Sequence, residues 1–213
     1  MRLSKEFYQQ DTRKVARRLL GCKLVSVIDN DRREGIIVET EAYLHRNDPA
    51  CHAARGMTRR NRVMFSSPGT LYVYTIHTRF CMNVVTEPEG VGAAVLIRAL
   101  QPVAGIESME QCRGNSPHLN RLPNLTNGPG KLCQALGIDL QHNGESLILG
   151  ENLWIETCVT PSRFKISQSG RIGISQGVDL KYRFFVDGNA FVSGPSRYHR
   201  TKKGSTLYIK NEP

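Results

Sequence analysis

The chain has 213 residues, enough for a substantial core and few enough for one domain or two small ones. Lys and Arg number 29 against 19 Asp and Glu, which gives a net charge of +10. This excess favours a polyanionic partner such as nucleic acid, although a merely soluble basic protein also fits. No run approaches ~18 apolar residues, which excludes a membrane span. The N-terminus lacks a signal-peptide pattern, so we expect an intracellular protein, cytoplasmic if bacterial and nuclear if eukaryotic.

The first third of the chain predicts one helix, two strands and a long loop. Residues 11–20 place apolar side chains on one face and basic side chains elsewhere, as in an amphipathic helix. Apolar stretches at 24–28 and 35–43 flank a polar turn and are typical of strands. Residues 44–69 are polar and basic with little periodicity, which predicts a long functional loop.

The rest of the chain mixes strands and helices. Residues 70–76 and 81–85 predict two strands of a hairpin joined by HTRF, and residues 93–100 predict a buried strand. Further helices are predicted at 105–112 and 131–138, and further strands at 153–157, near 171–175 and at 183–188. Without regular βαβ alternation, this order favours a single α+β domain with a largely antiparallel sheet and flanking helices. We expect one domain over residues 1–213, with a core at about 3–193 and a basic C-terminal segment at 194–213.

The cysteines suggest neither disulfides nor a metal site. There are six, irregularly spaced and without C-x-x-C: Cys22, Cys51, Cys81, Cys112, Cys133 and Cys158. We interpret them as reduced and mostly buried thiols. Zinc at His45, Cys51 and His52 is the alternative, but the spacing fits no usual zinc pattern, so we expect no metal.

Glu39 and Glu41 stand two residues apart in the apolar stretch GIIVETEAY, residues 35–43. Because side chains alternate along a strand, both carboxylates share a face with Tyr43. Two acids that close repel each other unless cations compensate, a setting that suits a general base or acid. In the alternative interpretation, one glutamate pairs with an arginine and the other faces solvent.

Aromatic side chains could form a binding surface near these acids. Tyr72 and Tyr74 share one face of the strand at 70–76 and could stack on a planar ligand, although a half-buried strand face explains them equally well. Tyr43, His52 and Tyr74 could also converge in space.

Two basic segments could contact phosphate. The loop RGMTRRNR holds four arginines in eight residues: Arg55, Arg59, Arg60 and Arg62. This density predicts contacts with a nucleic-acid backbone, with a solvated basic loop as the alternative. Lys131 follows Gly128-Pro-Gly at a predicted helix start, where backbone N–H groups and the ammonium could bind phosphate. The full P-loop spacing is missing, and a plain helix start fits as well.

Seven of these segments, in this order, resemble the alkyladenine (3-methyladenine) DNA glycosylase family, over about residues 3–193. They are VETEAY (38–43), His52, RNRVMF (60–65), PGTLYVYTI (68–76), FCMN (80–83), LIRALQP (96–102) and GPGKLCQALGI (128–138). The resemblance implies a curved sheet and a protruding hairpin that inserts into DNA. It implies a monofunctional enzyme of base excision repair that flips a damaged purine out of double-stranded DNA and hydrolyses its N-glycosidic bond. Alkylated and deaminated purines remain open as substrates: 3-methyladenine, 7-methylguanine, hypoxanthine and ethenoadenine.

The resemblance also assigns residue roles. Glu41 would be the catalytic base that activates a water for attack on C1′, and Arg98 would hold that water. The flipped base would be stacked between aromatic walls at Tyr43, His52 and Tyr74. Asn83 would crowd the 2-amino group of guanine. We expect a monomer that needs no cofactor.

The hairpin tip departs from the family pattern. Family members carry an intercalating tyrosine there, but the segment TIHTRFCMN is one residue shorter and has His77 at that position. Either His77 fills the gap left by the flipped nucleotide, or Arg79 or another residue of the tip does. An imidazole is a smaller and more polar wedge, so we expect weaker retention of the flipped state.

Three other functions are compatible with a basic α+β chain. The main alternative is a non-catalytic protein that binds damaged DNA. An RNA-binding module is another, although the acids of VETEAY argue against it because buried acids repel phosphate. A small-molecule hydrolase that uses Glu39 and Glu41 as a pair is the third.

Overall fold

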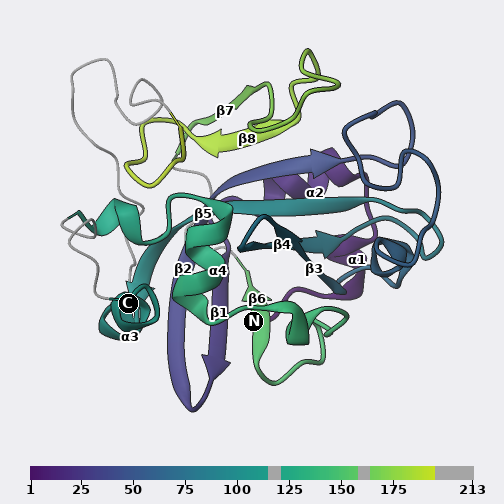
Figure 1. Ribbon diagram of the computed structural model, residues 1–213. Coiled ribbons are helices and arrows are strands. Elements are labelled where there is room, and N and C mark those ends of the chain that lie inside the picture. The colour runs from purple at the N-terminus through teal and green to yellow at the C-terminus, as the bar shows by residue number, and fades with distance from the viewer. Residues whose placement is uncertain (115–120, 158–163, 195–213) are drawn as a thin grey trace.

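The computed structural model describes residues 1–114, 121–157 and 164–194 (Figure 1). Its helices are α1 (Lys5–Tyr8), α2 (Thr12–Arg18), α3 (Ile106–Cys112) and α4 (Pro129–Leu136), with 3-10 turns η1 (Arg62–Phe65), η3 (Leu122–Leu125) and η4 (Leu140–His142). Its strands are β1 (Lys23–Ile28), β2 (Asp31–Tyr43), β3 (Leu71–Ile76), β4 (Arg79–Val85), β5 (Ala94–Ala104), β6 (Leu153–Glu156), β7 (Ile166–Ser169) and β8 (Arg183–Val186). Within the described residues, no helix is long and apolar enough to span a membrane.

One curved antiparallel sheet organises the molecule. Its strands follow the order β3-β4-β5-β2-β1-β6, and β8 pairs with both β2 and β7. The long strands β2 and β5 run side by side at the centre (Figure 1). Both faces of β2 are buried from Ile36 to Ala42, which explains why this segment is a nearly continuous apolar run. The prediction of an α+β domain with an antiparallel sheet is confirmed.

Helix α2 covers one face of the centre of the sheet. The Asp11 carboxylate caps its N-terminus by accepting from the backbone N–H groups of Arg13 and Lys14. The buried side of the helix packs on β2, where the Thr40 hydroxyl donates to the Ala16 carbonyl at 2.9 Å. Because side chains alternate along β2, Glu39 and Glu41 point to the other face. The predicted helix is confirmed, although it ends at Arg18.

Helix α4 packs across β4 and β5, with α3 beside it (Figure 1). Pro129 occupies the first turn, and Gly137 ends the helix in the left-handed region at φ +75°. The side chains that this helix buries are Leu132, Cys133, Ala135 and Leu136. This packing brings the start of α4 close to the β3–β4 hairpin.

The hairpin between β3 and β4 has a loop of two residues, His77 and Thr78, since Ile76 pairs directly with Arg79. The second strand therefore begins two residues earlier than expected. His77 has a φ of +52°, as the first central position of a tight hairpin turn requires. Ile76, His77 and Thr78 are all exposed.

The strand predicted near 171–175 does not include these residues. These residues form an irregular loop, and the backbone N–H of Ile172 donates to Glu41 instead of to a neighbouring strand. The strand found near them is β7, which ends at Ser169, two residues before Arg171. Residues 195–213, which contain almost all of the basic C-terminal segment, lie outside the described residues.

The cysteines of the described residues are free thiols. Those of Cys22, Cys51, Cys81 and Cys133 are buried, and Cys112 is half-buried. This agrees with the expected reduced thiols for five of the six cysteines, since Cys158 lies outside the described residues.

Candidate active site

Irregular pairing between β2 and β5 aims Arg98 at both acids. The register shifts on each side of Glu39, and it leaves Val38 on β2 and Arg98 on β5 with no residue directly opposite in this strand pair. Such bulges redirect side chains and are common beside active sites. The Arg98 guanidinium donates to Glu39 from Nε and to Glu41 from Nη1, each at 3.2 Å. Both carboxylates therefore lie on the same side of β2, as alternation predicts.

Glu39 is completely buried, and both of its carboxylate oxygens accept hydrogen bonds. Besides Arg98, its carboxylate accepts a hydrogen bond from Arg183 Nε at 2.6 Å. It also accepts from the backbone N–H of Ser193 at 2.6 Å and from the Ser193 hydroxyl at 2.9 Å. Glu39 thus pairs with arginines, as the alternative interpretation allowed for one of the two acids.

Glu41 is also completely buried, but fewer groups contact it. Its Oε1 accepts from Ile172 N at 2.8 Å, and its Oε2 accepts from the Tyr43 hydroxyl at 2.8 Å and from Arg98. Burial raises the pKa of Tyr43 and the Glu41 charge raises it further, so the phenol stays protonated and donates. Contrary to the alternative interpretation, Glu41 does not face solvent.

The charges of this network balance. Burial opposes the charge of Arg98, but its attraction to Glu41 and then to Glu39 outweighs that effect and raises the pKa of the guanidinium. Arg183 is only 1% exposed and supplies a second cation. Buried carboxylates need such paired and hydrogen-bonded cations to remain ionised. Two acids and two arginines thus form one buried cluster.

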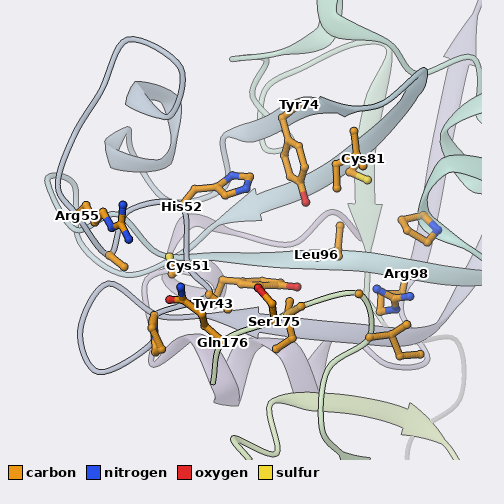
Figure 2. Close-up of a pocket in the computed structure, with 18 of the residues that line it drawn as sticks. Tyr43, Cys51, His52, Arg55, Tyr74, Cys81, Leu96, Arg98, Ser175 and Gln176 are labelled. Atoms are coloured by element: carbon orange, nitrogen blue, oxygen red, sulfur yellow. The ribbon is translucent and has the colours of Figure 1, made fainter. Parts of the chain in front are cut away.

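A pocket of about 790 Å³ opens beside this cluster (Figure 2). Tyr43 forms one wall, and His52 and Tyr74 face it from the other side (Figure 2). The rings of His52 and Tyr74 lie 4.6 Å apart and meet edge to face, and His52 Nδ1 lies 3.0 Å from the Tyr72 hydroxyl. The three rings, which the sequence left free to converge, line one pocket. Facing aromatic walls suit a flat ligand.

Arg171 holds the Tyr43 wall from behind. Its guanidinium carbon lies 4.6 Å from the centre of the Tyr43 ring. The same guanidinium donates to both carboxylate oxygens of Asp48 at 2.6 Å and to the Ala42 carbonyl at 3.0 Å. Both side chains of the Asp48–Arg171 pair are completely buried. The pair ties the loop after β7 to the loop after β2.

Asn61 holds the opposite wall. Its side-chain amide donates to the His52 carbonyl at 2.8 Å and to the Gly56 carbonyl at 3.0 Å, and it accepts from Thr58 N at 2.6 Å. Partial burial and the charge of Arg60 lower the pKa of His52, which favours the neutral imidazole. The long loop 44–69 thus positions one face of the pocket.

The model of the methylpurine-DNA glycosylase family matches residues 6–190, most of the chain. The chain belongs to the methylpurine-DNA glycosylase family. This assignment confirms the resemblance seen in the sequence, and with it the expectation that the chain is a DNA glycosylase.

Relatives of this glycosylase carry the provisional name 3-methyladenine DNA glycosylase. One from Rhodopirellula baltica is 46% identical over 96% of this chain and 88% of its own length. One from Chlorobium phaeobacteroides is 48% identical over 91% of this chain and 96% of its own. One from Methanoculleus marisnigri is 47% identical over 91% of this chain and 99% of its own.

Asn83 lies behind the aromatic walls of the glycosylase pocket. It helps to line a cavity of about 20 Å³ together with Tyr43, His52 and Tyr74, and it is only 3% exposed. Its side-chain amide donates to the Tyr72 carbonyl at 3.0 Å, which fixes its orientation. Asn83 therefore lies beside the space between the rings.

Only some of the basic residues that the sequence analysis assigned to DNA lie at the pocket. Arg55 and His77 line the pocket, whereas Arg59, Arg60 and Arg62 are exposed on the same loop as Arg55 and do not line it. Lys131 does not line it either. Its ammonium donates to the Asn127 side chain, and its neighbour Pro129 reaches the pocket instead.

Sequence reasoning missed a whole segment of the glycosylase site. The loop after β7 supplies Ile172, Ser175 and Gln176 to the pocket, and Figure 2 shows Ser175 and Gln176 beside Tyr43. Arg171 precedes them in the alternating pattern RIGIS, which predicted a strand. The sequence offered one signal for this role, the charged Arg171 within an otherwise strand-like pattern.

Proposed function

We propose that this protein removes alkylated purines from double-stranded DNA by hydrolysing their N-glycosidic bonds. The observation that carries the proposal is a buried carboxylate, Glu41, bonded by Arg98 and by Tyr43, whose ring forms a wall of an aromatic pocket. The names of the relatives support 3-methyladenine as a substrate. We further propose that the enzyme acts as a monomer with one domain, in the compartment that holds the DNA.

In our proposal, Glu41 keeps one hydrogen-bonding site for a catalytic water. An ionised carboxylate offers about four lone-pair sites, and three hydrogen bonds from protein groups occupy Glu41. In our proposal a water uses the remaining site, Arg98 orients it, and Glu41 takes its proton as the oxygen attacks C1′. The negative carboxylate also stabilises the positive charge that develops on the sugar.

The aromatic walls favour a flipped and positively charged base. Extruding a nucleotide costs a few kcal/mol, and stacking returns about 1–3 kcal/mol for each aromatic face. Purines methylated at N3 or N7 are cationic, so stacking on Tyr43 and Tyr74 adds a cation–π attraction. A neutral lesion such as hypoxanthine lacks this gain, and we expect it to be excised more slowly. In our proposal Asn83 excludes guanine by crowding its 2-amino group.

Excision assays with a set of lesions test the proposal. Duplexes carrying 3-methyladenine, 7-methylguanine, hypoxanthine or ethenoadenine are incubated with the enzyme, and free base is measured. We expect release of 3-methyladenine at least, and no release of undamaged guanine. Binding without release would instead support a non-catalytic damage-binding protein, and hydrolysis of free nucleosides would support a small-molecule hydrolase.

His52 is expected to give excision a pH dependence that varies with the charge of the base. Its lowered pKa keeps the imidazole neutral until the pH falls below the usual histidine range. Below that point a charged His52 repels a cationic base, so 7-methylguanine excision should decrease more than hypoxanthine excision. Rates for both lesions across the acid range check this. The His52→Phe variant should lose the difference, because phenylalanine does not titrate.

We propose that His77, rather than Arg79, fills the gap left by the flipped nucleotide. His77 is exposed at the hairpin tip and lines the pocket, whereas Arg79 donates to the Gln134 side chain at 2.8 Å. Replacing His77 by Ala should slow single-turnover excision and shift the flipping equilibrium, followed by fluorescence of a base analogue, towards the stacked state. Thr78→Ala, at the next position of the loop, is the matched control. Unchanged rates and equilibria in His77→Ala would contradict this role.

A further inference from the structure

Three cationic side chains gather where α4 meets α3 and the hairpin. They are Arg79 on β4, Arg113 at the end of α3 and Lys131 on α4. The Nη1 atoms of Arg79 and Arg113 donate to the same oxygen, Gln134 Oε1, at 2.8 and 2.7 Å. The two guanidinium groups are therefore held close together by one neutral amide.

No carboxylate compensates these charges within the described part of the chain, where none of the three cations forms an ion pair. Burial and then the charge of Arg79 lower the pKa of Arg113, and burial and then Arg113 lower the pKa of Lys131. The buried Nε of Arg113 also has no hydrogen-bond partner among these residues. The buried arginines of the active site differ, since Arg98, Arg171 and Arg183 all bond carboxylates. Mutually repelling and incompletely bonded cations are typical of a site for an anion.

The cluster is built into the fold. A Cβ on Gly130 would lie 2.9 Å from Arg79 Cβ, so only glycine lets Arg79 lie this close to α4. A hollow of about 350 Å³ lies beside it and is lined by Arg79, Gly130 and Gln134. Asp139 also lines this hollow, but its carboxylate caps the turn that follows it by accepting a hydrogen bond from Gln141 N at 2.8 Å.

The cluster also adjoins the active-site pocket. Pro129, two residues before Lys131, and His77, two residues before Arg79, both line that pocket. A DNA strand whose damaged nucleotide occupies the pocket therefore continues close to these cations. The backbone of such a strand presents one negative charge for each nucleotide.

We propose that Arg79, Arg113 and Lys131 together bind a backbone phosphate of the DNA next to the hairpin. The inference rests on the proposed function and adds Arg79 and Arg113 to Lys131, the only one of the three that the sequence analysis assigned to the backbone. Guanidinium groups match the phosphate oxygens in geometry, and the anion removes the repulsion between the cations.

The salt dependence of DNA binding tests this site. The dissociation constant of a duplex with an uncleavable abasic analogue is measured across salt concentrations for the wild type and Arg113→Gln. Loss of one of the three cations that share this phosphate should reduce the slope of log K against log salt by up to about 0.9. Lys14→Gln, on α2 at the opposite face of the sheet, is the matched control and should keep the wild-type slope. Arg113→Lys keeps the charge and should keep most of the slope.

A thermal-unfolding measurement without DNA separates this role from a structural one. Removing a repelling cation should leave the unfolding temperature of Arg113→Gln unchanged or higher. A lower unfolding temperature with an unchanged salt slope would overturn the proposal. Lys131→Gln is an independent test, because it removes a cation of the same phosphate site from α4 instead of α3. It should reduce the salt slope in the same way. Wild-type excision measured in parallel tests the proposed function separately, since the slope reports binding and base release reports chemistry.

Discussion

Replacing Glu41 by Gln is expected to stop base release while duplex DNA still binds. The substitution keeps the size of the side chain and an oxygen that can accept from Ile172 N or Tyr43, but an amide cannot take a proton from water. General-base catalysis contributes about 10²- to 10⁴-fold, and we expect a loss of at least that size. Single-turnover excision of 3-methyladenine, with the dissociation constant of an uncleavable duplex, measures both quantities.

A second glutamate of the same strand provides the control. Glu34 pairs with Lys23 at 2.9 Å and also with Arg32, at the opposite end of β2 from Glu41. Glu34→Gln removes the same charge far from the pocket and should excise at the wild-type rate. Equal activity of the Glu41 and Glu34 variants would eliminate Glu41 as the base. It would then favour a mechanism in which Arg98 and the pocket walls act without a carboxylate.

Replacing Glu39 by Gln is expected to affect mainly stability. Glu39 pairs with two buried arginines and accepts two further bonds from Ser193, whereas Glu41 contacts one arginine. Breaking a buried ion pair from one side costs about 3–5 kcal/mol. In a chain of this length each kcal/mol lowers the unfolding temperature by about 2–4 °C, which predicts a decrease of roughly 6–20 °C. Thermal unfolding of the two variants side by side checks this.

An exposed ion pair provides the control for this change in unfolding temperature. Asp187 lies 3.6 Å from Lys165, and both side chains are well exposed. Because exposed pairs contribute about 0–1 kcal/mol, Asp187→Asn should unfold within a few degrees of the wild type. If Glu39→Gln behaved like Asp187→Asn, or if Glu41→Gln were the less stable variant of the two, the division of roles between the acids would be wrong.

Local patterns predicted most of the sheet. The apolar run at 35–43 and the two strands of the hairpin appear in the structure because each buries side chains at strand spacing. Residues 171–175 alternate in sequence in the same way but form no strand. There the buried Arg171 guanidinium donates to the Ala42 carbonyl, and the backbone N–H of Ile172 donates to Glu41. Strand β7, with the sequence ISQS, is short and polar, and it is formed through pairing with β8. Pairing of that kind leaves little trace in a local pattern.

The candidate site was predicted in its residues more than in its connections. Family resemblance and spacing indicated Glu41, Tyr43 and Arg98, which the structure brings together. The contacts that hold them span long distances in sequence, such as Glu39 with Arg183 and Asp48 with Arg171. Whether an arginine pairs with an acid more than 100 residues away depends on the tertiary fold, and composition carries no record of it.

The buried Asp48–Arg171 pair has a consequence for kinetics. It joins the loop after β2 to the loop after β7 and places Arg171 against the Tyr43 ring. Asn61 binds the His52 carbonyl on the other side of the pocket. Both aromatic walls are therefore held in place without DNA. In our proposal, a purine that leaves the DNA helix enters a slot whose walls are already in place, so no loop closure is needed. We expect capture to be limited by spontaneous opening of the base pair, and discrimination to come from fit to a fixed shape instead of induced fit.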